Sequence, residues 1–268
     1  MNERRAFLKS LVAAAVPDSP PKPPPEPDPW VERYSRQLVL PQWSEAAQRA
    51  LADASVLVVG AGALGSPVAT YLAGAGVGRL GIVDDGDVEL SNLHRQHLHF
   101  TPDLGVPKAH SAVAKLGFLN PDIVVEPYQA RFNEAMLEGT DLVVDCTDAF
   151  ATRYAVNAAC CAAGVALVEG GVVGTSGLVM AIRPGETACY RCAFPAPPPA
   201  GAVPTCAQAG VLGPAAGVIG SLQALEAMKL LAGLPALTDA FLQVDLATHD
   251  FLSVAVRRRE DCPDCGTA

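Results

Sequence analysis

The fold can be inferred from one stretch, Ser55-Val56-Leu57-Val58-Val59-Gly60-Ala61-Gly62-Ala63-Leu64-Gly65. The residues before the first glycine are mostly apolar and β-branched, which is typical of a buried strand. The Gly-x-Gly-x-x-Gly loop permits a tight turn and a close approach of phosphate to the backbone. The helix expected from Ser66 would present free N–H groups to that phosphate. The stretch predicts a nucleotide-binding α/β fold, although a glycine turn without a ligand would show the same pattern.

Strands and helices are predicted to alternate around this stretch. Helices are expected at 29–40, 44–52, 66–75, 108–119, 152–163 and 219–231, and strands at 55–59, 79–84, 123–128, 142–145, 165–170, 177–183, 240–245 and 251–256. Such alternation is typical of a Rossmann-like, doubly wound sheet whose first strands are parallel. Because few helices separate the last strands, we expect an antiparallel C-terminal extension.

The composition excludes some classes of protein. Half of the 268 residues are hydrophobic and 18% are charged, so the chain can bury a sizeable core. The formal net charge of -9 argues against a nucleic-acid partner, whose binding surface would be basic. No apolar run reaches the roughly 18 residues of a membrane span, so no membrane partner is expected either.

The first 29 residues differ from the rest. Arg4-Arg5-Ala6-Phe7-Leu8-Lys9 looks like a twin-arginine export motif, but the apolar run Leu11–Val16 is shorter than the usual ~7–15 residues. The segment Pro17–Pro29 is rich in proline and acidic residues. We therefore expect a disordered N-terminal tail and Pro-rich linker over 1–29, followed by one folded domain over 30–268.

Polar residues follow the predicted strands at the edge where such sheets bind ligands. Asp84 ends the strand after the glycine loop, where an acid can bind ribose hydroxyls. Asn92, Arg95 and Lys108 come next, and cationic groups beside a nucleotide loop suit a triphosphate. Asp148 follows the strand 142–145 and could hold Mg²⁺. The pattern favours ATP, with an NAD(P)-dependent oxidoreductase as the alternative.

Four of the eight cysteines form two Cys-x-x-Cys pairs, Cys189 with Cys192 and Cys262 with Cys265. Four thiolates from two such pairs suit a tetrahedral, structural Zn²⁺. The alternative is two disulfides or two redox pairs. A zinc site would tie the C-terminal end of the chain to the loop that carries the first pair.

Seven motifs occur in order between Arg33 and Cys265. They are Arg33-Tyr34-Ser35-Arg36-Gln37, Gly60-Ala61-Gly62-Ala63-Leu64-Gly65, Ser91-Asn92-Leu93-His94-Arg95-Gln96, Asp145-Cys146-Thr147-Asp148, Cys189-Tyr190-Arg191-Cys192, Thr205-Cys206-Ala207-Gln208-Ala209-Gly210 and Cys262-Pro263-Asp264-Cys265. Together they resemble the HesA/MoeB/ThiF family, bacterial relatives of ubiquitin-activating enzymes, and most of all its molybdopterin-type MoeB members.

The resemblance implies a cytoplasmic homodimer that uses ATP to adenylate the C-terminal glycine carboxylate of a small ubiquitin-like sulfur-carrier protein of the MoaD or ThiS type. The residues implied to bind ATP, its phosphates or Mg²⁺ are Gly60, Gly62, Ala63, Gly65, Asp84, Ser91, Asn92, Arg95, Lys108 and Asp148. Those implied to act in catalysis are Arg36, Arg95, Lys108, Asp148 and Cys206. Arg36 would reach across the dimer interface into the partner's ATP site.

Several points stay open at this stage. Ala63 stands where the family usually has glycine and Ala149 where asparagine is common, so a catalytically degenerate ATP-binding member is a further alternative. A methyl group at position 63 would crowd the phosphates if φ there were positive. Cys206 would lie near the carrier's C-terminus, and whether it forms a covalent link is open. With no sulfurtransferase domain expected before the end at Ala268, sulfur would come from a separate donor.

Overall fold

The computed structural model describes residues 28–199 and 209–266. Almost all of the expected tail, including the arginine pair, lies outside the described residues, as does Cys206. The chain has two compact units, Met1–Arg36 and Gln37–Ala268. Helix α2 (Pro29–Leu38) begins in the shorter unit, where the rings of Trp30 and Tyr34 pack edge-to-face with 5.5 Å between their centroids.

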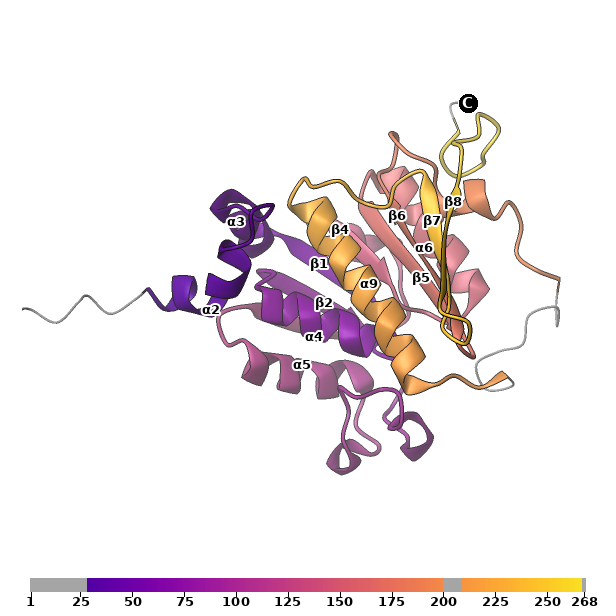
Figure 1. The fold of residues 1–268 in the computed structure, drawn as a ribbon. Coiled ribbons are helices and arrows are strands. Elements are labelled where there is room, and N and C mark those ends of the chain that lie inside the picture. Colours follow the sequence, from indigo (N-terminus) through magenta and orange to yellow (C-terminus); the bar gives the residue numbers. More distant parts are fainter. Residues whose placement is uncertain (1–27, 200–208, 267–268) are drawn as a thin grey trace, which may run out of the picture. The chain divides into compact units, whose positions relative to one another are not determined.

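The larger unit is built on one eight-stranded sheet with the order β3-β2-β1-β4-β5-β6-β7-β8 (Figure 1). The strands are β1 (Ser55–Val59), β2 (Arg79–Val83), β3 (Val124–Tyr128), β4 (Leu142–Asp145), β5 (Ala166–Val173), β6 (Ser176–Ile182), β7 (Ala240–Asp245) and β8 (Asp250–Ala255). The first five are parallel to one another, and β6, β7 and β8 continue the sheet in antiparallel pairing. The predicted fold class is confirmed.

Helices cover both faces of this sheet. Figure 1 shows α4, α5 and α9 in front of the sheet and α6 behind it. The helices described in the larger unit are α3 (Glu45–Asp53), α4 (Gly65–Ala75), α5 (Lys108–Leu119), α6 (Phe150–Ala163), the short α7 (Tyr190–Ala193) and α9 (Gly213–Leu231), with 3-10 turns η1 (Leu90–Asn92), η2 (Thr101–Asp103) and η3 (Glu134–Leu137). None of the helices within 28–199 and 209–266 is both long and apolar enough to span a membrane.

Two hydrophobic cores result, one on each face. Side chains alternate along β1, so Val56 and Val58 belong to the core under α4, α5 and α9, whereas Leu57 and Val59 belong to the core under α6. A strand buried on both faces has no polar face, which explains the continuous apolar run in the sequence.

Helix α9 differs most from its predicted bounds. It begins at Gly213, six residues before the expected start at 219, with Pro214 in its first turn. A side chain at Gly220 would place its Cβ 2.4 Å from Pro67 and 2.7 Å from the carbonyl oxygen of Leu64. The close packing of α9 against α4 therefore requires a glycine at position 220.

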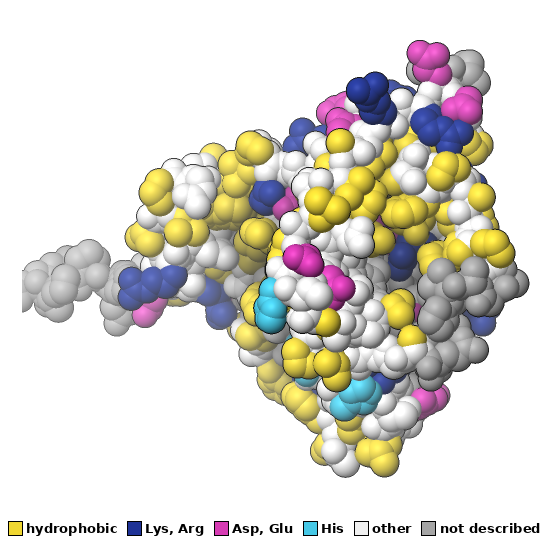
Figure 2. Space-filling model, turned by 45° about the vertical axis from the view of Figure 1, so that its right-hand side comes forward, with side chains coloured by type: hydrophobic (Ala, Val, Ile, Leu, Met, Phe, Trp, Pro, Cys, Tyr) yellow, Lys and Arg dark blue, Asp and Glu magenta, His cyan; other side chains and the backbone are white. Residues whose placement is uncertain are grey.

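The charged surface is consistent with the acidic composition. On the face drawn in Figure 2, the coloured Lys and Arg side chains are scattered and form no continuous basic patch. This face therefore offers no extended surface for a nucleic-acid backbone.

Candidate nucleotide and metal sites

Three loops meet where the parallel strands β2, β1 and β4 end. The backbone N–H of Gly60 donates to Val83 O at 2.7 Å, and that of Cys146 donates to Val59 O at 2.8 Å. The glycine loop after β1 therefore lies between Asp84, which follows β2, and the turn that follows β4. In open α/β sheets this carboxyl edge is where nucleotides bind.

The glycine loop needs its first and last glycines for steric reasons. Gly60 has a φ of 98°, in the left-handed region. A Cβ at Gly65 would lie 1.9 Å from Gly60 O, so the helix can start here only with glycine. No side chain caps the start of α4. The loop thus leaves this helix end available to an anion.

Asp84 is fixed beside this loop. Its Oδ2 accepts a hydrogen bond from Ala61 N and its Oδ1 accepts one from Gly86 N, both at 2.8 Å. Lys108 N donates to Gly86 O at 2.9 Å, and its Nζ would lie 3.4 Å from a Cβ built on Gly86. The structure therefore brings the predicted ribose acid and the predicted phosphate-binding lysine together.

Arg95 and Asn92 also lie together, in the loop that includes η1. The Nη1 of Arg95 donates to Ser91 O at 2.9 Å and its Nη2 to Asn92 Oδ1 at 3.2 Å. A Cβ at Gly62 would lie 3.5 Å from Nε2 of Gln96, so this loop packs against the glycine loop. The half-buried Arg95 forms no ion pair with the described part of the chain.

Asp148 lies on the other side of the glycine loop, three residues past the end of β4. It is exposed and is followed by Ala149, the N-cap of α6. Within 28–199 and 209–266, no hydrogen bond or ion pair holds its carboxylate. The carboxylate is thus available to a cation at the edge where the phosphates would lie.

The four paired cysteines form one buried cluster. Their sulfur atoms all lie within 4.8 Å of one another, with 3.6 Å between Cys189 and Cys262 and 3.4 Å between Cys192 and Cys265. A disulfide would bring two sulfurs to about 2.05 Å. A tetrahedral ion with bonds of about 2.3 Å would hold them about 3.8 Å apart. The thiols are free, and their spacing suits a metal ion rather than two disulfides.

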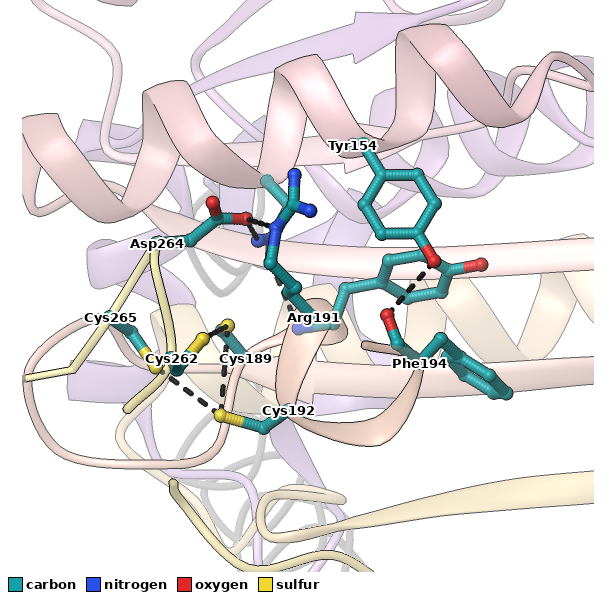
Figure 3. Close-up of polar contacts among 10 residues, drawn as sticks. Tyr154, Cys189, Arg191, Cys192, Phe194, Cys262, Asp264 and Cys265 are labelled. Atoms are coloured by element: carbon teal, nitrogen blue, oxygen red, sulfur yellow. Dashed lines mark hydrogen bonds and ion pairs between the residues drawn. The ribbon is translucent and has the colours of Figure 1, made fainter. Parts of the chain in front are cut away.

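Side chains next to the cysteines join this cluster to α6 (Figure 3). Asp264 Oδ2 accepts hydrogen bonds from Asn157 Nδ2 at 2.7 Å and from Arg191 Nε at 2.8 Å. The guanidinium of Arg191 lies over the ring of Tyr154, 4.7 Å from its centroid. Both cysteine pairs are thereby held against the same helix, whose N-terminus follows Asp148.

Residues 34–264 match the ThiF family. The chain belongs to the ThiF family. It is 47% identical over 246 residues to the sulfur carrier protein adenylyltransferase of Thermus thermophilus, covering 88% of this chain and 91% of that protein. It is also 47% identical over 240 residues to the adenylyltransferase and sulfurtransferase MOCS3 of Sus scrofa, covering 87% of this chain but 53% of that protein, so it spans about half of this relative.

The chain shares its fold with a solved structure. The E. coli MccB structure with ATP has a TM-score of 0.78 and 23% sequence identity, covering 88% of this chain and 75% of that chain. At this identity the likeness concerns the fold alone.

The structure shows the surroundings of Ala63 and Ala149, the two departures from the ThiF family pattern. Among the described non-glycine residues, only Asp239 and His249 have a positive φ, so the methyl group of Ala63 meets no backbone strain. Ala149 is the N-cap of α6 and offers no side-chain hydrogen bond, whereas an asparagine could cap the helix. Neither departure removes a charged group from the nucleotide edge.

The roles of two predicted site residues, Arg36 and Cys206, stay predictions. Arg36 lies in the last turn of α2 and belongs to the shorter unit, Met1–Arg36. Cys206 lies outside the described residues. The strand order brings the glycine loop, Asp84 and Asp148 to one edge, and loop contacts add Arg95 and Lys108.

The sequence interpretation missed His99, which is buried behind the glycine loop. Its Nε2 lies 2.8 Å from Ala61 O and its Nδ1 lies 2.9 Å from Ser111 Oγ. Because a carbonyl oxygen only accepts, Nε2 carries the proton and Nδ1 accepts from the hydroxyl. Burial lowers the pKa of His99, which favours this neutral form. The residue was missed because its partners are distant in sequence.

The sequence interpretation also missed a buried charged cluster beneath the Asp148 turn, formed by Asp145, Arg153 and Glu169. Arg153 Nε lies 3.5 Å from Glu169 Oε2. Burial raises the pKa of Glu169 well above its usual range and Asp145 raises it further, whereas Arg153 lowers it. The available signal was a charged residue within each of two predicted elements, Arg153 in the helix at 152–163 and Glu169 in the strand at 165–170.

Glu169→Gln is expected to make the protein's stability less sensitive to pH. A carboxyl group whose pKa is raised by folding stabilises the fold at low pH, and this stability is lost as pH rises toward the folded pKa. The stability of the variant relative to the wild type should therefore grow as the pH rises above the usual Glu pKa of about 4.3, by about 1.4 kcal/mol for each unit by which folding raises the pKa of Glu169. Thermal unfolding of both proteins at increasing pH measures the difference, and a constant or shrinking gap would contradict the expectation.

Proposed function

We propose that this ThiF-family chain is an ATP-dependent adenylyltransferase that activates the C-terminal glycine carboxylate of a small ubiquitin-like sulfur-carrier protein and releases pyrophosphate. The observation that carries the proposal is the grouping of cationic and acidic side chains around the uncapped start of α4. The name of the Thermus thermophilus relative, a sulfur carrier protein adenylyltransferase, supports the choice of substrate.

Each residue of the nucleotide edge has a role in this proposal. The glycine loop and the first turn of α4 would hold the phosphates of ATP, and Asp84 would bind the ribose. Lys108 and Arg95, the latter held by Asn92, would neutralise the charge that develops on the phosphates. Asp148 would hold Mg²⁺, which when bound would stabilise the leaving pyrophosphate.

The chemical step needs positioning more than proton transfer. The carrier's carboxylate is already ionised, so one of its oxygens can attack the α-phosphorus without a general base. A new O–P bond forms, and the bond between the α-phosphorus and its bridging oxygen breaks. The electron pair leaves with pyrophosphate, and the product is an acyl-adenylate. Fixed cationic groups at the site would supply most of the stabilisation.

The four-thiolate cluster is proposed as a structural zinc site. Cys189, Cys192, Cys262 and Cys265 provide four ligands in a suitable spacing, and such a set leaves no open coordination position for substrate. Zinc would hold the two cysteine pairs together against α6.

The wider setting is also proposed. We expect a cytoplasmic homodimer. In this dimer Arg36 would reach the ATP site of the partner and supply a further cation at the phosphates. A separate donor would provide sulfur to the adenylated carrier.

ATP–pyrophosphate exchange tests the function. With a MoaD-type or ThiS-type carrier ending in Gly-Gly, labelled pyrophosphate should enter ATP. The same carrier without its last glycine should give no exchange. Absence of exchange with every such carrier would refute the proposal, and binding of a nicotinamide dinucleotide in its place would favour the oxidoreductase alternative.

Cys206→Ala is expected to leave exchange within about twofold of the wild type, because adenylation uses no thiol. Any effect should appear only in the later transfer of sulfur to the carrier. Comparing exchange with thiocarboxylate formation by mass spectrometry separates the two steps. Loss of exchange in this variant would show that the thiol acts before the adenylate forms.

A further inference from the structure

The side chain of Arg153 bridges two loops at the nucleotide edge. It is 6% exposed, and its Nη2 donates to Thr147 O at 2.9 Å and to Gly170 O at 2.8 Å. Thr147 immediately precedes Asp148. The last paired residues of β4 and β5 are Asp145 and Glu169. Arg153 therefore joins the two chain segments at the point where the backbone pairing of the strands ends.

Two glycines of β5 make room for this arrangement. A Cβ at Gly171 would lie 2.8 Å from Nη1 of Arg153, and a Cβ at Gly170 would lie 2.1 Å from Cδ of Gln223. Gln223, from α9, donates to Asp145 O at 2.7 Å. Arg153 and Gln223 thus reach backbone carbonyls near the end of β4 from opposite faces of the sheet. They can do so only because positions 170 and 171 of β5 are glycines.

The hydrogen bonds of Arg153 go to carbonyl groups rather than to its charged neighbours. The carboxylates of Asp145 and Glu169 are fully buried, yet Glu169 accepts no hydrogen bond from the described residues. Asp145 Oδ1 accepts from Thr147 N at 2.8 Å, which makes a second bond to the same turn. The two carboxyl groups lie beside the buried guanidinium, while its Nη2 holds the backbone carbonyls.

We propose that Arg153 is a positioning residue for the divalent-metal site, and that its bonds to Thr147 O and Gly170 O hold the turn in the conformation that presents Asp148 to the metal. This inference rests on the proposed function, which assigns the metal to Asp148. Residues that orient a metal ligand without contacting the metal commonly lower the metal affinity by about 10–100-fold when they are replaced.

The test compares three variants of the full chain. Glu169→Gln retains both carbonyl bonds of Arg153 and is the control. Arg153→Lys keeps the positive charge on a shorter side chain that cannot reach both carbonyls in the same way. The double variant Arg153→Met with Glu169→Gln removes the bonds to the carbonyls. It also replaces the carboxyl group of Glu169, so that this buried group is not left without its partner.

The readout is the dissociation constant of ATP, measured by calorimetry with Mn²⁺ present and with EDTA. For Arg153→Lys and the double variant, binding with Mn²⁺ should weaken by about 10–100-fold, while binding in EDTA stays within about twofold of the wild type. Glu169→Gln should match the wild type in both conditions. Hydrogen exchange should also become faster at the amides of Thr147 and Asp148 in the two Arg153 variants.

The outcomes separate this inference from the proposed function. If the wild type binds ATP no better with Mn²⁺ than in EDTA, and Asp148→Ala changes nothing, then the metal site itself is wrong and the inference falls with it. A second case is that Mn²⁺ tightens ATP binding by the wild type, but both Arg153 variants bind ATP as tightly as the wild type. A third is that both variants bind ATP more weakly by the same factor with Mn²⁺ and in EDTA. Either result refutes only the positioning role. Should the double variant fail to fold, Arg153→Lys decides.

Discussion

Asp148→Ala is expected to lower ATP–pyrophosphate exchange by at least about a hundredfold, because a group that stabilises developing charge at phosphorus commonly contributes this much. The fold should be unaffected. Asp148 is exposed, and within the described residues its carboxylate holds no other group. Exchange rates at saturating carrier, measured over a range of Mg²⁺ concentrations, would show whether the loss reflects weaker binding of the metal.

Asp53→Ala is the matched control for this substitution. Asp53 is also exposed, but it ends α3 just before β1 begins, so it lies at the opposite edge of the sheet from the glycine loop. Exchange by this variant should stay within about twofold of the wild type, and both variants should unfold at nearly the wild-type temperature. Exchange by Asp148→Ala at the wild-type rate would remove Asp148 from the mechanism.

Cys265→Ser is expected to cause the largest loss of stability. One thiolate fewer should release the metal, and structural zinc sites contribute folding free energy directly. We expect the bound zinc to fall from one ion per chain to near zero, and the unfolding midpoint to drop by at least about 10 °C. Elemental analysis of the purified protein and calorimetric unfolding would measure both quantities.

Cys160→Ser provides the control for the zinc prediction, because Cys160 is a buried cysteine of α6 that lies outside the four-thiolate cluster. This variant should keep its zinc. A reducing agent should leave the wild-type midpoint unchanged, whereas two disulfides would make the midpoint fall on reduction. Wild-type protein without zinc, or Cys265→Ser with a full zinc content, would contradict the proposed site.

Much of the nucleotide edge could be predicted because its signals are local or follow from topology. The glycine loop is recognised from the steric needs of one turn, and Asp84 and Asp148 are recognised because each follows a predicted strand. Once the first strands are parallel, all three must lie at the same edge. The start of α9 was predicted six residues too late, since Gly213, Pro214 and Gly217 in its first turns have low helix propensity.

The buried partners behind that edge could not be predicted in the same way. Arg153 was visible as a charge within a predicted helix, but its contacts with Thr147 O and Gly170 O depend on how α6 lies against β5. His99 contacts Ala61 O across 38 positions of the chain, and no local pattern links the two. Such contacts are decided by the packing of whole elements.

The sequence by itself therefore determined the class of fold, the glycine loop with its neighbouring acids and cations, and the two cysteine pairs. These features depend on backbone conformation and on residue spacing along the chain, which a sequence displays directly. Only the tertiary structure decided that the four thiols meet at metal-binding distances and that Arg153 braces the turn before Asp148. Both arrangements join residues that are far apart or on different elements, and their geometry is set by the register of the strands and the packing of α6 against the sheet.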